Sequence, residues 1–198
     1  MTITTTAVHG PLTVLCGNPR PGSRTLEVAL RTADALAAGQ AAAGGATTPG
    51  GATTAGAQPG PRVIDLAHLA PHLFRGPDAD IDEALRVVAS SSVLVVASPV
   101  YKASYTGLLK AFLDRYGPSP LVGVVAVPLM LVAQPGHRLA ADTHLRPLLV
   151  ELGASTPTTS LVVEGSELGL DPGPVEEWAA AQAGLAWAAA RTRDPVGV

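Results

Sequence analysis

The chain has 198 residues, of which 47% are hydrophobic and 15% are charged, and its formal net charge is −3. This length and composition fit one globular domain over residues 1–198 with a sizeable core, and they exclude a disordered tail. The small negative charge gives no general attraction to nucleic acid or to anionic membranes, so any anion site must come from a local arrangement of donors.

The sequence favours a cytoplasmic protein. Cys16 is the single cysteine, so no internal disulfide can form, which fits a reducing compartment. The first residues, MTITTTAVHG, lack the basic start and apolar core of a signal peptide. The longest apolar run, 121–133, has 13 residues, whereas a membrane span needs about 20.

Short apolar runs alternate with helix-like patterns along the chain. In chain order, these patterns predict a strand over 12–16, a helix over 24–37, a strand over 62–66, a helix over 78–92, a strand over 92–98, a helix over 104–117, a strand over 122–131, a helix over 137–153 that is interrupted or kinked near Pro147, a strand over 156–165 and a helix over 173–193. The strand over 92–98 is apolar on both faces, which is typical of a covered parallel sheet.

This alternation predicts an α/β fold with a five-stranded parallel sheet and helices on both faces. Right-handed crossovers favour the strand order 2-1-3-4-5. Ligands of such a sheet bind at the carboxyl ends of its strands, near the point where the strand order reverses. The loops to search are therefore 17–24, 98–104 and 131–137.

Residues 38–61 do not follow the alternation. This segment consists only of Ala, Gly, Gln, Thr and Pro, so it contains no large apolar residue and no charge. Such a composition cannot repay the entropy of ordering the chain. We expect a flexible low-complexity insertion between the first helix and the second strand, far from the ligand-binding edge.

The stretch CGNPRPGSRT, residues 16–25, links the first strand to the first helix. A loop in this position can aim backbone N–H groups and a helix N-terminus at a phosphate, and Arg20 and Arg24 can add charge-assisted hydrogen bonds. The loop lacks the lysine of a P-loop and the G-x-G-x-x-G of dinucleotide folds. A plain turn with a Ser or Thr helix cap explains the stretch equally well when it is considered alone.

The stretch ASPVYKASYTGLLKAFLDRYG, residues 97–117, follows the third strand. Together with GNPRPGSRT it resembles the NADPH-dependent FMN reductases, in particular the reductase components of two-component alkanesulfonate-type monooxygenases. That family shows GSPRxxSRS/T after the first strand and TPVYKASYSGxLKxxLD after the third. The block HRLAADTHLRPLL, residues 137–149, is similar to a third block of the family. The resemblance covers nearly the whole domain except 38–61.

The resemblance implies a flavodoxin-like fold with FMN and NADPH as ligands. It places the FMN phosphate on the first loop, the flavin ring and ribityl chain on the second, and the pyrimidine edge of the ring on the loop after the fourth strand. The cofactor-binding residues implied in these three loops are Asn18, Arg20, Ser23, Arg24, Thr25, Pro99, Val100, Tyr101, Lys102, Val132 and Ala133.

The activity implied is hydride transfer from NADPH to FMN, which supplies reduced flavin to a partner monooxygenase. The protein then contributes orientation and electrostatics, so no catalytic residue is predicted. Two alternatives remain open: a reductase with tightly bound FMN that passes electrons to a quinone, an azo compound or another small acceptor, and a non-catalytic flavin or electron carrier. A homodimer or homotetramer is usual in the family.

Three positions depart from the family pattern. Asn18 replaces a serine of the phosphate loop, and an Asn side chain can still donate a hydrogen bond. Leu131-Val132-Ala133 replaces a Thr-Gly-Gly whose glycines allow a close approach to the flavin. Thr143 replaces an aromatic residue that some members carry in a distorted helix near the flavin. The last two departures favour the alternative with tightly bound FMN.

Several other residues carry no functional prediction. Cys16 is expected to be buried, and Trp178 and Trp187 are expected to pack in the core or at an interface. His68 and His72 have helical i, i+4 spacing, but Pro71 between them argues against a metal-binding helix. No metal is predicted.

Overall fold

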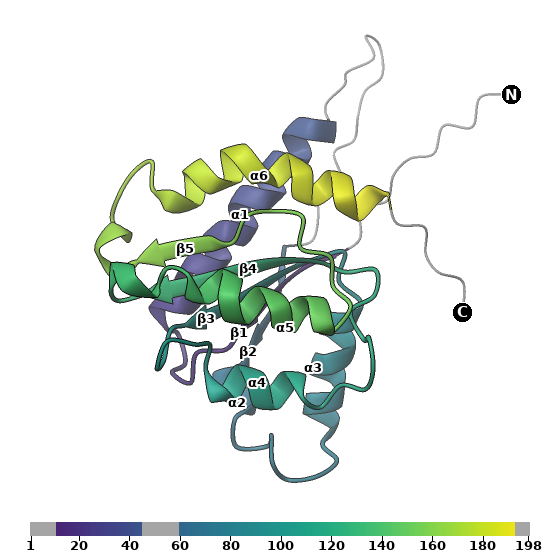
Figure 1. Ribbon diagram of the computed structural model, residues 1–198. Helices are drawn as coiled ribbons and strands as arrows, with labels where there is room; N and C mark the ends of the chain where they lie inside the picture. The colour runs from purple at the N-terminus through teal and green to yellow at the C-terminus, as the bar shows by residue number, and fades with distance from the viewer. Residues whose placement is uncertain (1–10, 45–59, 193–198) are drawn as a thin grey trace, which may run out of the picture.

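The sheet has five parallel strands in the order β2-β1-β3-β4-β5. The computed structural model describes residues 11–44 and 60–192, and within them the order is the one that the sequence predicts (Figure 1). The strands are β1 Leu12–Cys16, β2 Arg62–Asp65, β3 Val93–Pro99, β4 Val125–Val132 and β5 Leu161–Glu164. The strand order reverses at β1 and β3, so this point of the sheet is where a ligand is expected.

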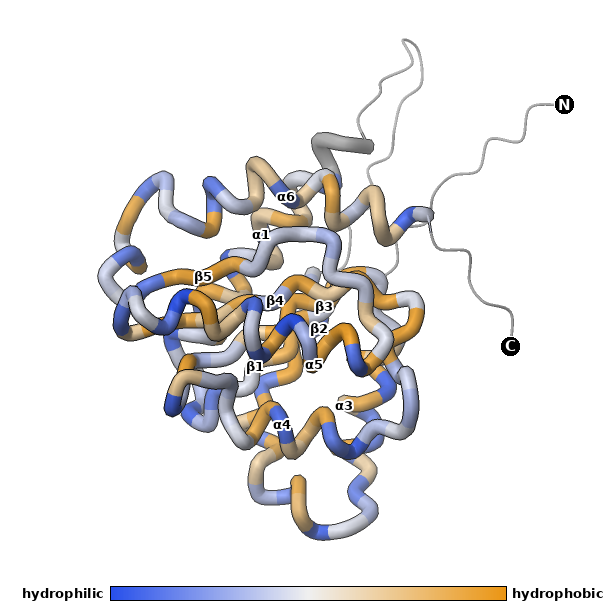
Figure 2. The backbone as a smooth tube through the Cα atoms, viewed as in Figure 1, coloured by the Kyte–Doolittle hydropathy of each residue, from blue (hydrophilic) through white to orange (hydrophobic). Residues whose placement is uncertain are grey.

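The strands β1, β3 and β4 are mostly buried, since helices cover both faces of the sheet. All seven residues of the central strand β3 are buried, and the tube in Figure 2 is orange along the middle of the sheet. Val95 packs in one hydrophobic cluster and its neighbour Leu94 packs in the other, as successive side chains of a strand must. The continuous apolar runs of the sequence thus reflect burial on both faces.

The helices form a layer on each face of the sheet (Figure 1). One layer contains α1 Arg24–Gly44 and α6 Pro174–Arg191. The other contains α2 Leu66–Leu69, α3 Ala79–Ala89, α4 Gly107–Leu113 and α5 Arg146–Glu151. Two short 3-10 helices, η1 Pro135–His137 and η3 Gly165–Glu167, follow β4 and β5. No helix of the described residues has the length and hydropathy needed to cross a membrane.

The first helix is longer than the sequence pattern predicts. It continues to Gly44, so the prediction that residues 38–44 belong to a flexible insertion is wrong. Alanine is the best helix former, and α1 and α6 lie against each other in the same layer. Trp187 of α6 donates its indole N–H to the carbonyl of Leu36 at 2.8 Å, and Gly39 lies against Ala183. Residues 45–59 of the predicted insertion lie outside the described residues.

The interruption predicted near Pro147 takes the form of a π-helix, η2 Ala141–Leu145, which runs directly into α5. Pro147 lies in the first turn of α5, directly after the π-helix, and has no N–H to donate to the preceding π-helical turn. The wider π-helical turn thus comes before the proline. Thr143 lies within this π-helix and is exposed, and its Oγ1 donates to the Leu139 carbonyl at 2.9 Å.

Candidate functional site

A cavity of about 730 Å³ lies at the carboxyl edge of the sheet. Four loops build it, one after each of β1, β3, β4 and β5. All the residues predicted to bind cofactor line it, except Lys102. The structure thus brings together three segments that are far apart in the sequence, at the place where the strand order reverses.

The loop after β1 is held in shape by Asn18. Its Nδ2 donates to Thr25 Oγ1 at 3.0 Å, and its Oδ1 accepts from the backbone N–H of Arg20 at 2.9 Å. Asn18 is 7% exposed and Thr25 is fully buried. The residue that departs from the family's serine therefore ties the two ends of the loop together, and its second amide N–H stays available for a ligand.

The same loop delivers the N-terminus of α1 to the cavity. Ser23 precedes the helix, and its Oγ accepts from the backbone N–H of Leu26 at 3.3 Å, while its carbonyl accepts from Glu27 N at 3.1 Å. Ser23 therefore caps the helix, which is the Ser or Thr cap that the plain-turn alternative expects. Unpaired N–H groups and the positive end of the helix dipole lie in the first turn, so this wall of the cavity suits an anion.

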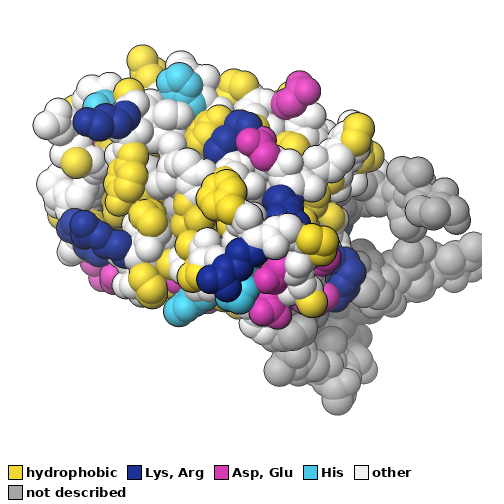
Figure 3. Space-filling view, turned by 90° about the horizontal axis from the view of Figure 1, so that it is seen from below, with side chains coloured by type: hydrophobic (Ala, Val, Ile, Leu, Met, Phe, Trp, Pro, Cys, Tyr) yellow, Lys and Arg dark blue, Asp and Glu magenta, His cyan; other side chains and the backbone are white. Residues whose placement is uncertain are grey.

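Arg20 and Arg24 supply positive charge at this wall. Both are exposed, and neither forms an ion pair with a described residue. On the face shown in Figure 3, basic and acidic side chains are interspersed, so no large patch of one sign gathers there. The attraction for an anion therefore depends on these local groups and on the helix N-terminus.

The loops after β1 and β3 are fixed to each other through α4. Thr106 caps α4, accepting from Leu109 N at 3.2 Å, and its Oγ1 donates to the carbonyl of Gly17 at 2.5 Å. Gly17 also donates its N–H to the Ala97 carbonyl at 2.8 Å. A Cβ on Gly17 would lie 2.6 Å from Leu109 Cβ, so this position requires glycine. The geometry of the two loops is thus set by the packing of α4.

A tight turn follows β3 beside the cavity. Tyr101 and Ser104 exchange backbone hydrogen bonds of 2.8 and 3.1 Å, and the two residues between them have positive φ, 51° at Lys102 and 64° at Ala103. Both residues adopt left-handed backbone conformations, although neither is a glycine. Tyr101 is 45% exposed at the cavity. Lys102 lies at the tip of the turn and is not among the lining residues, so the structure does not place it where the resemblance predicts.

The third wall is the end of β4, where the family's glycines are absent. Val132 is 1% exposed and belongs to the core cluster that also contains Met130, so little of its side chain faces the cavity. Ala133 is exposed, and the Leu131 carbonyl accepts from Val100 N at 3.0 Å. Of the two side chains that replace the glycines, the larger one therefore turns into the core.

Sequence reasoning missed Gly165 and Ser166, which start η3 directly after β5 and line the cavity. No motif marks them. The available signal was their position at the carboxyl end of the fifth strand, at the same edge as the other three loops. Pro21 and Gly22 of the first loop also line the cavity.

The residues expected to be ordinary have structural partners. Cys16 is fully buried, and this burial raises the pKa of its thiol. Trp178 and Trp187 pack in the core cluster beneath α6. His72 Nδ1 lies 2.8 Å from Asp78 Oδ2, and among the described residues only His72, Asp78 and Asp80 bring three possible metal ligands close together. Asp78 caps α3, so this cluster has a structural explanation.

The fold is flavodoxin-like, and its cavity lies at the carboxyl edge of the sheet, bounded on one side by the loop after β1. Residues 11–167 match the sequence profile of the NADPH-dependent FMN reductases, and the chain belongs to this family. This finding confirms the family that the two loop motifs indicate.

Individual relatives match shorter segments. An NADH-dependent FMN reductase SfnF of Pseudomonas putida is 41% identical over 81 residues, which cover 39% of this chain and 42% of the relative. An FMN reductase (NADPH) of Escherichia coli (strain K12) is 46% identical over 61 residues, which cover 31% of this chain and 32% of the relative. The aligned segments thus span less than half the length of these curated relatives.

Two solved structures resemble the chain over nearly its full length. The apo form of an NADH:FMN oxidoreductase, EmoB, superimposes with a TM-score of 0.70 at 30% identity, covering 95% of this chain and 91% of that one. An oxidoreductase from Corynebacterium diphtheriae superimposes with a TM-score of 0.74 at 26% identity, covering 94% of this chain and all of that one.

Proposed function

We propose that the protein is an NAD(P)H:FMN oxidoreductase, with NADPH as the expected hydride donor. One wall of the cavity, formed by residues 18–25, supports this proposal most strongly, because it combines a capped helix N-terminus with two arginines that form no ion pair with a described residue. Family membership supplies the identity of the anion, because the relatives named above are FMN reductases.

The cavity fits FMN in chemistry and in size. The positive charges of Arg20 and Arg24 match a phosphate dianion, and Asn18, which also lines the cavity, has a second amide N–H that would donate to it. Pro99, Val100 and Tyr101 also line the cavity and offer apolar and aromatic surface to a flavin ring. A volume of about 730 Å³ lies in the range of ordinary cofactor sites.

The side chains of the cavity support a role in positioning rather than in acid–base chemistry. Among the described residues that line it there is no Asp, Glu, His or Cys. FMN bound here would supply the hydride-accepting centre, and the protein would hold the phosphate, cover the ring and keep the donor oriented.

We further propose that reduced flavin leaves this protein for a partner monooxygenase, and that the protein assembles as a homodimer or homotetramer. Both statements rest on the family. Measurement of the mass in solution tests the assembly. Transfer to an oxygenase is tested by separating the two proteins with a dialysis membrane, which only free reduced flavin can cross.

A second candidate is a reductase that keeps FMN bound and passes electrons to a small acceptor such as a quinone. Thr143 favours it, because this exposed residue lies in the π-helix where some family members carry an aromatic residue. Under this alternative the protein purifies with FMN attached and follows ping-pong kinetics with a quinone.

Steady-state oxidation of NADPH and NADH tests the proposed activity. The proposal requires that a folded sample oxidises one of them at a rate that depends on added FMN. If added FMN has no effect and the purified protein already contains flavin, the second candidate replaces the first. If neither nucleotide is consumed by a folded sample, both are wrong.

A further inference from the structure

The loop after β5 bounds the first cavity at the end farthest from the proposed phosphate site. In the sheet, β3 and β4 lie between β1 and β5, so the loops after β1 and β5 are three strand spacings apart, about 14 Å. A ligand whose phosphate lies at residues 18–25 can reach Gly165 and Ser166 only with its opposite end. In FMN that end is the flavin ring.

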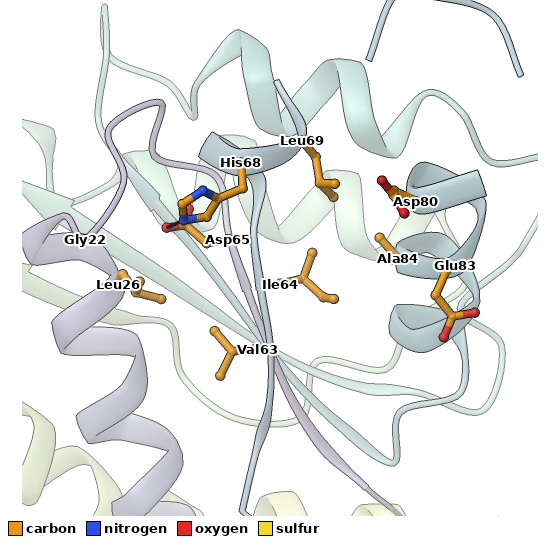
Figure 4. A pocket seen from close by; sticks show the side chains of 10 residues that line it. All are labelled: Gly22, Leu26, Val63, Ile64, Asp65, His68, Leu69, Asp80, Glu83 and Ala84. Atoms are coloured by element: carbon orange, nitrogen blue, oxygen red, sulfur yellow. Dashed lines mark ion pairs between the residues drawn. The ribbon is translucent and has the colours of Figure 1, made fainter. Parts of the chain in front are cut away.

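A second cavity, of about 620 Å³, lies beside β2, on the other side of the first loop (Figure 4). Leu26 of α1 and Glu83 of α3 lie on opposite sides of the strand there. Among the described residues, the two cavities share only Gly22. Arg20 and Arg24 line the first cavity and not the second, so a ligand that they hold extends along the loops after β3, β4 and β5.

Few side chains in the far part of the first cavity can bind the polar edge of a flavin ring. The lining residues outside the first loop are Pro99, Val100, Tyr101, Leu131, Val132, Ala133, Gly165 and Ser166. Only Tyr101 and Ser166 of this set carry a polar group on the side chain. The pyrimidine ring of the flavin has carbonyl and N–H groups, which need partners when a site covers them.

Ser166 has a hydroxyl that is free to make such a contact. The residue is exposed at the cavity, and its Oγ forms no hydrogen bond with a described residue. A serine hydroxyl carries one donor and two acceptor positions, so it can donate to a carbonyl of the ring.

Arg138 holds the turn that carries this serine. It follows η1, after β4, and its Nη1 lies 2.9 Å from Glu164 Oε1 and 3.6 Å from Glu167 Oε1. Glu167 Oε2 also accepts from the backbone N–H of Glu164 at 2.7 Å. The two glutamates flank Gly165 and Ser166, so one guanidinium ties η3 to the segment after β4.

This ion-pair cluster is suited to positioning the turn rather than to stabilising the whole fold. The Arg138 side chain is 44% exposed and that of Glu164 is 18% exposed. Partly exposed ion pairs contribute little to global stability, so loss of Arg138 should loosen η3 without unfolding the protein. A turn that is fixed in advance loses less entropy when a ligand binds to it.

We propose that Ser166 is a flavin-binding residue whose hydroxyl donates to a carbonyl of the pyrimidine ring, and that Arg138 is the residue that positions it. The inference rests on the proposed function, because it requires FMN in the first cavity. It adds a contact from the loop after β5, which neither of the two loop motifs contains.

Fluorescence titration with FMN and with riboflavin tests the role of Ser166. Ser166→Ala should raise the Kd of both flavins by the same factor, about three- to tenfold, because the lost hydrogen bond goes to the ring that they share. Arg20→Gln should raise the Kd of FMN alone. Ser166→Thr keeps a hydroxyl and should bind both flavins more tightly than Ser166→Ala. Ser90→Ala is the control, since Ser90 is also exposed but lies at the end of α3, outside the cavity.

The outcomes separate this inference from the proposed function. If the folded wild type binds neither flavin, both are wrong. If the wild type binds FMN and Ser166→Ala keeps the wild-type Kd for both flavins, only this inference is wrong. Infrared difference spectra of bound FMN give a direct readout: the loss of a hydrogen bond should move a carbonyl stretch of the flavin to higher frequency in Ser166→Ala. An unchanged carbonyl stretch would overturn the assignment.

A double-variant cycle tests the role of Arg138. Arg138→Met should raise the Kd of both flavins by about twofold or more in the wild-type background, and should have no further effect when Ser166 is already alanine. An equal effect in both backgrounds would show that Arg138 does not act through Ser166. Arg86→Met is the control and should bind flavin as the wild type does, since Arg86 pairs with Glu83 beside the second cavity.

Discussion

Asn18 and Thr25 are joined by a buried hydrogen bond of 3.0 Å that spans the loop between β1 and α1. This bond sets the shape of the loop before any ligand arrives, so it links the stability of the fold to the proposed binding of the FMN phosphate. Thr25→Val removes the acceptor at nearly constant volume. We expect a loss of about 1–2 kcal/mol of folding stability and a higher Kd for FMN, measured by urea unfolding and by flavin fluorescence titration.

Thr32→Val provides the control for this change. Thr32 is also fully buried in α1 and its Oγ1 donates to the Val28 carbonyl at 2.8 Å, but it does not line the cavity. It should lose comparable stability and keep the wild-type Kd. A Kd for FMN that changes equally in both variants would contradict a specific role of the Asn18–Thr25 bond.

Gly17→Ala should destabilise the protein by about 1–3 kcal/mol, because the new Cβ would overlap Leu109 and push α4 away from the first loop. Thermal unfolding measures the loss. Gly107→Ala is the matched control, since a Cβ at Gly107 meets no atom within 4 Å and alanine is the better helix former. If Gly17→Ala unfolds at the wild-type temperature, the close packing of α4 on this loop is not required.

Ala103→Gly should stabilise the turn after β3 by up to ~1 kcal/mol, because alanine is held there at a φ of 64°. Two-residue hairpin turns of this kind favour glycine. The same substitution at Ala111, inside α4, should have the opposite sign and cost about 1 kcal/mol. Chemical denaturation of both variants checks the prediction, which fails if Ala103→Gly is as harmful as Ala111→Gly.

Asp78 should make stability depend on pH in the acid range. The hydrogen bond from His72 lowers the pKa of the Asp78 carboxyl, and the backbone N–H groups of Asp80 and Ile81 act in the same direction. Since the folded-state pKa lies below the unfolded one, the carboxylate stabilises the fold at neutral pH, and this contribution is lost as the pH falls through the folded-state pKa.

The variant Asp78→Asn isolates this effect, because Asn can cap α3 without titrating. It should be less stable than the wild type at neutral pH, and the difference in free energy of unfolding should shrink on acidification. A difference that stays constant down to strongly acid pH would show that the charge of Asp78 contributes nothing.

The sequence predicts the strand order and three walls of the cavity because both follow from patterns that can be recognised in the amino-acid sequence alone. Alternating apolar runs and helical faces specify the parallel sheet, and parallel strands place the loops at 17–25, 99–102 and 131–133 at one edge. The wall at Gly165 and Ser166 carries no motif, so only the assembled sheet reveals it.

Other features depend on contacts that composition does not encode. Residues 38–44 have the composition of a linker and also of a good helix, and the packing of α1 on α6 decides between them. Asn18 offers donors and an acceptor, but their partners in the loop appear only in three dimensions. Likewise, the Val132 side chain points into the core because of the register of β4. The alignment of Val132 with a glycine of the family motif does not reveal this direction.

The central claim, that residues 18–25 bind the phosphate of FMN for reduction by NAD(P)H, is tested most directly by the steady-state KM for FMN in the double variant Arg20→Gln/Arg24→Gln. We expect FMN-dependent NAD(P)H oxidation by the wild type and a KM for FMN that is at least about tenfold higher in the variant, since charge-assisted hydrogen bonds contribute about 1.5–3 kcal/mol each. Riboflavin, which has no phosphate, should be reduced equally by both proteins, and Arg75→Gln should behave as the wild type. A folded wild type that shows no FMN-dependent oxidation, or a double variant with the wild-type KM, would contradict the claim.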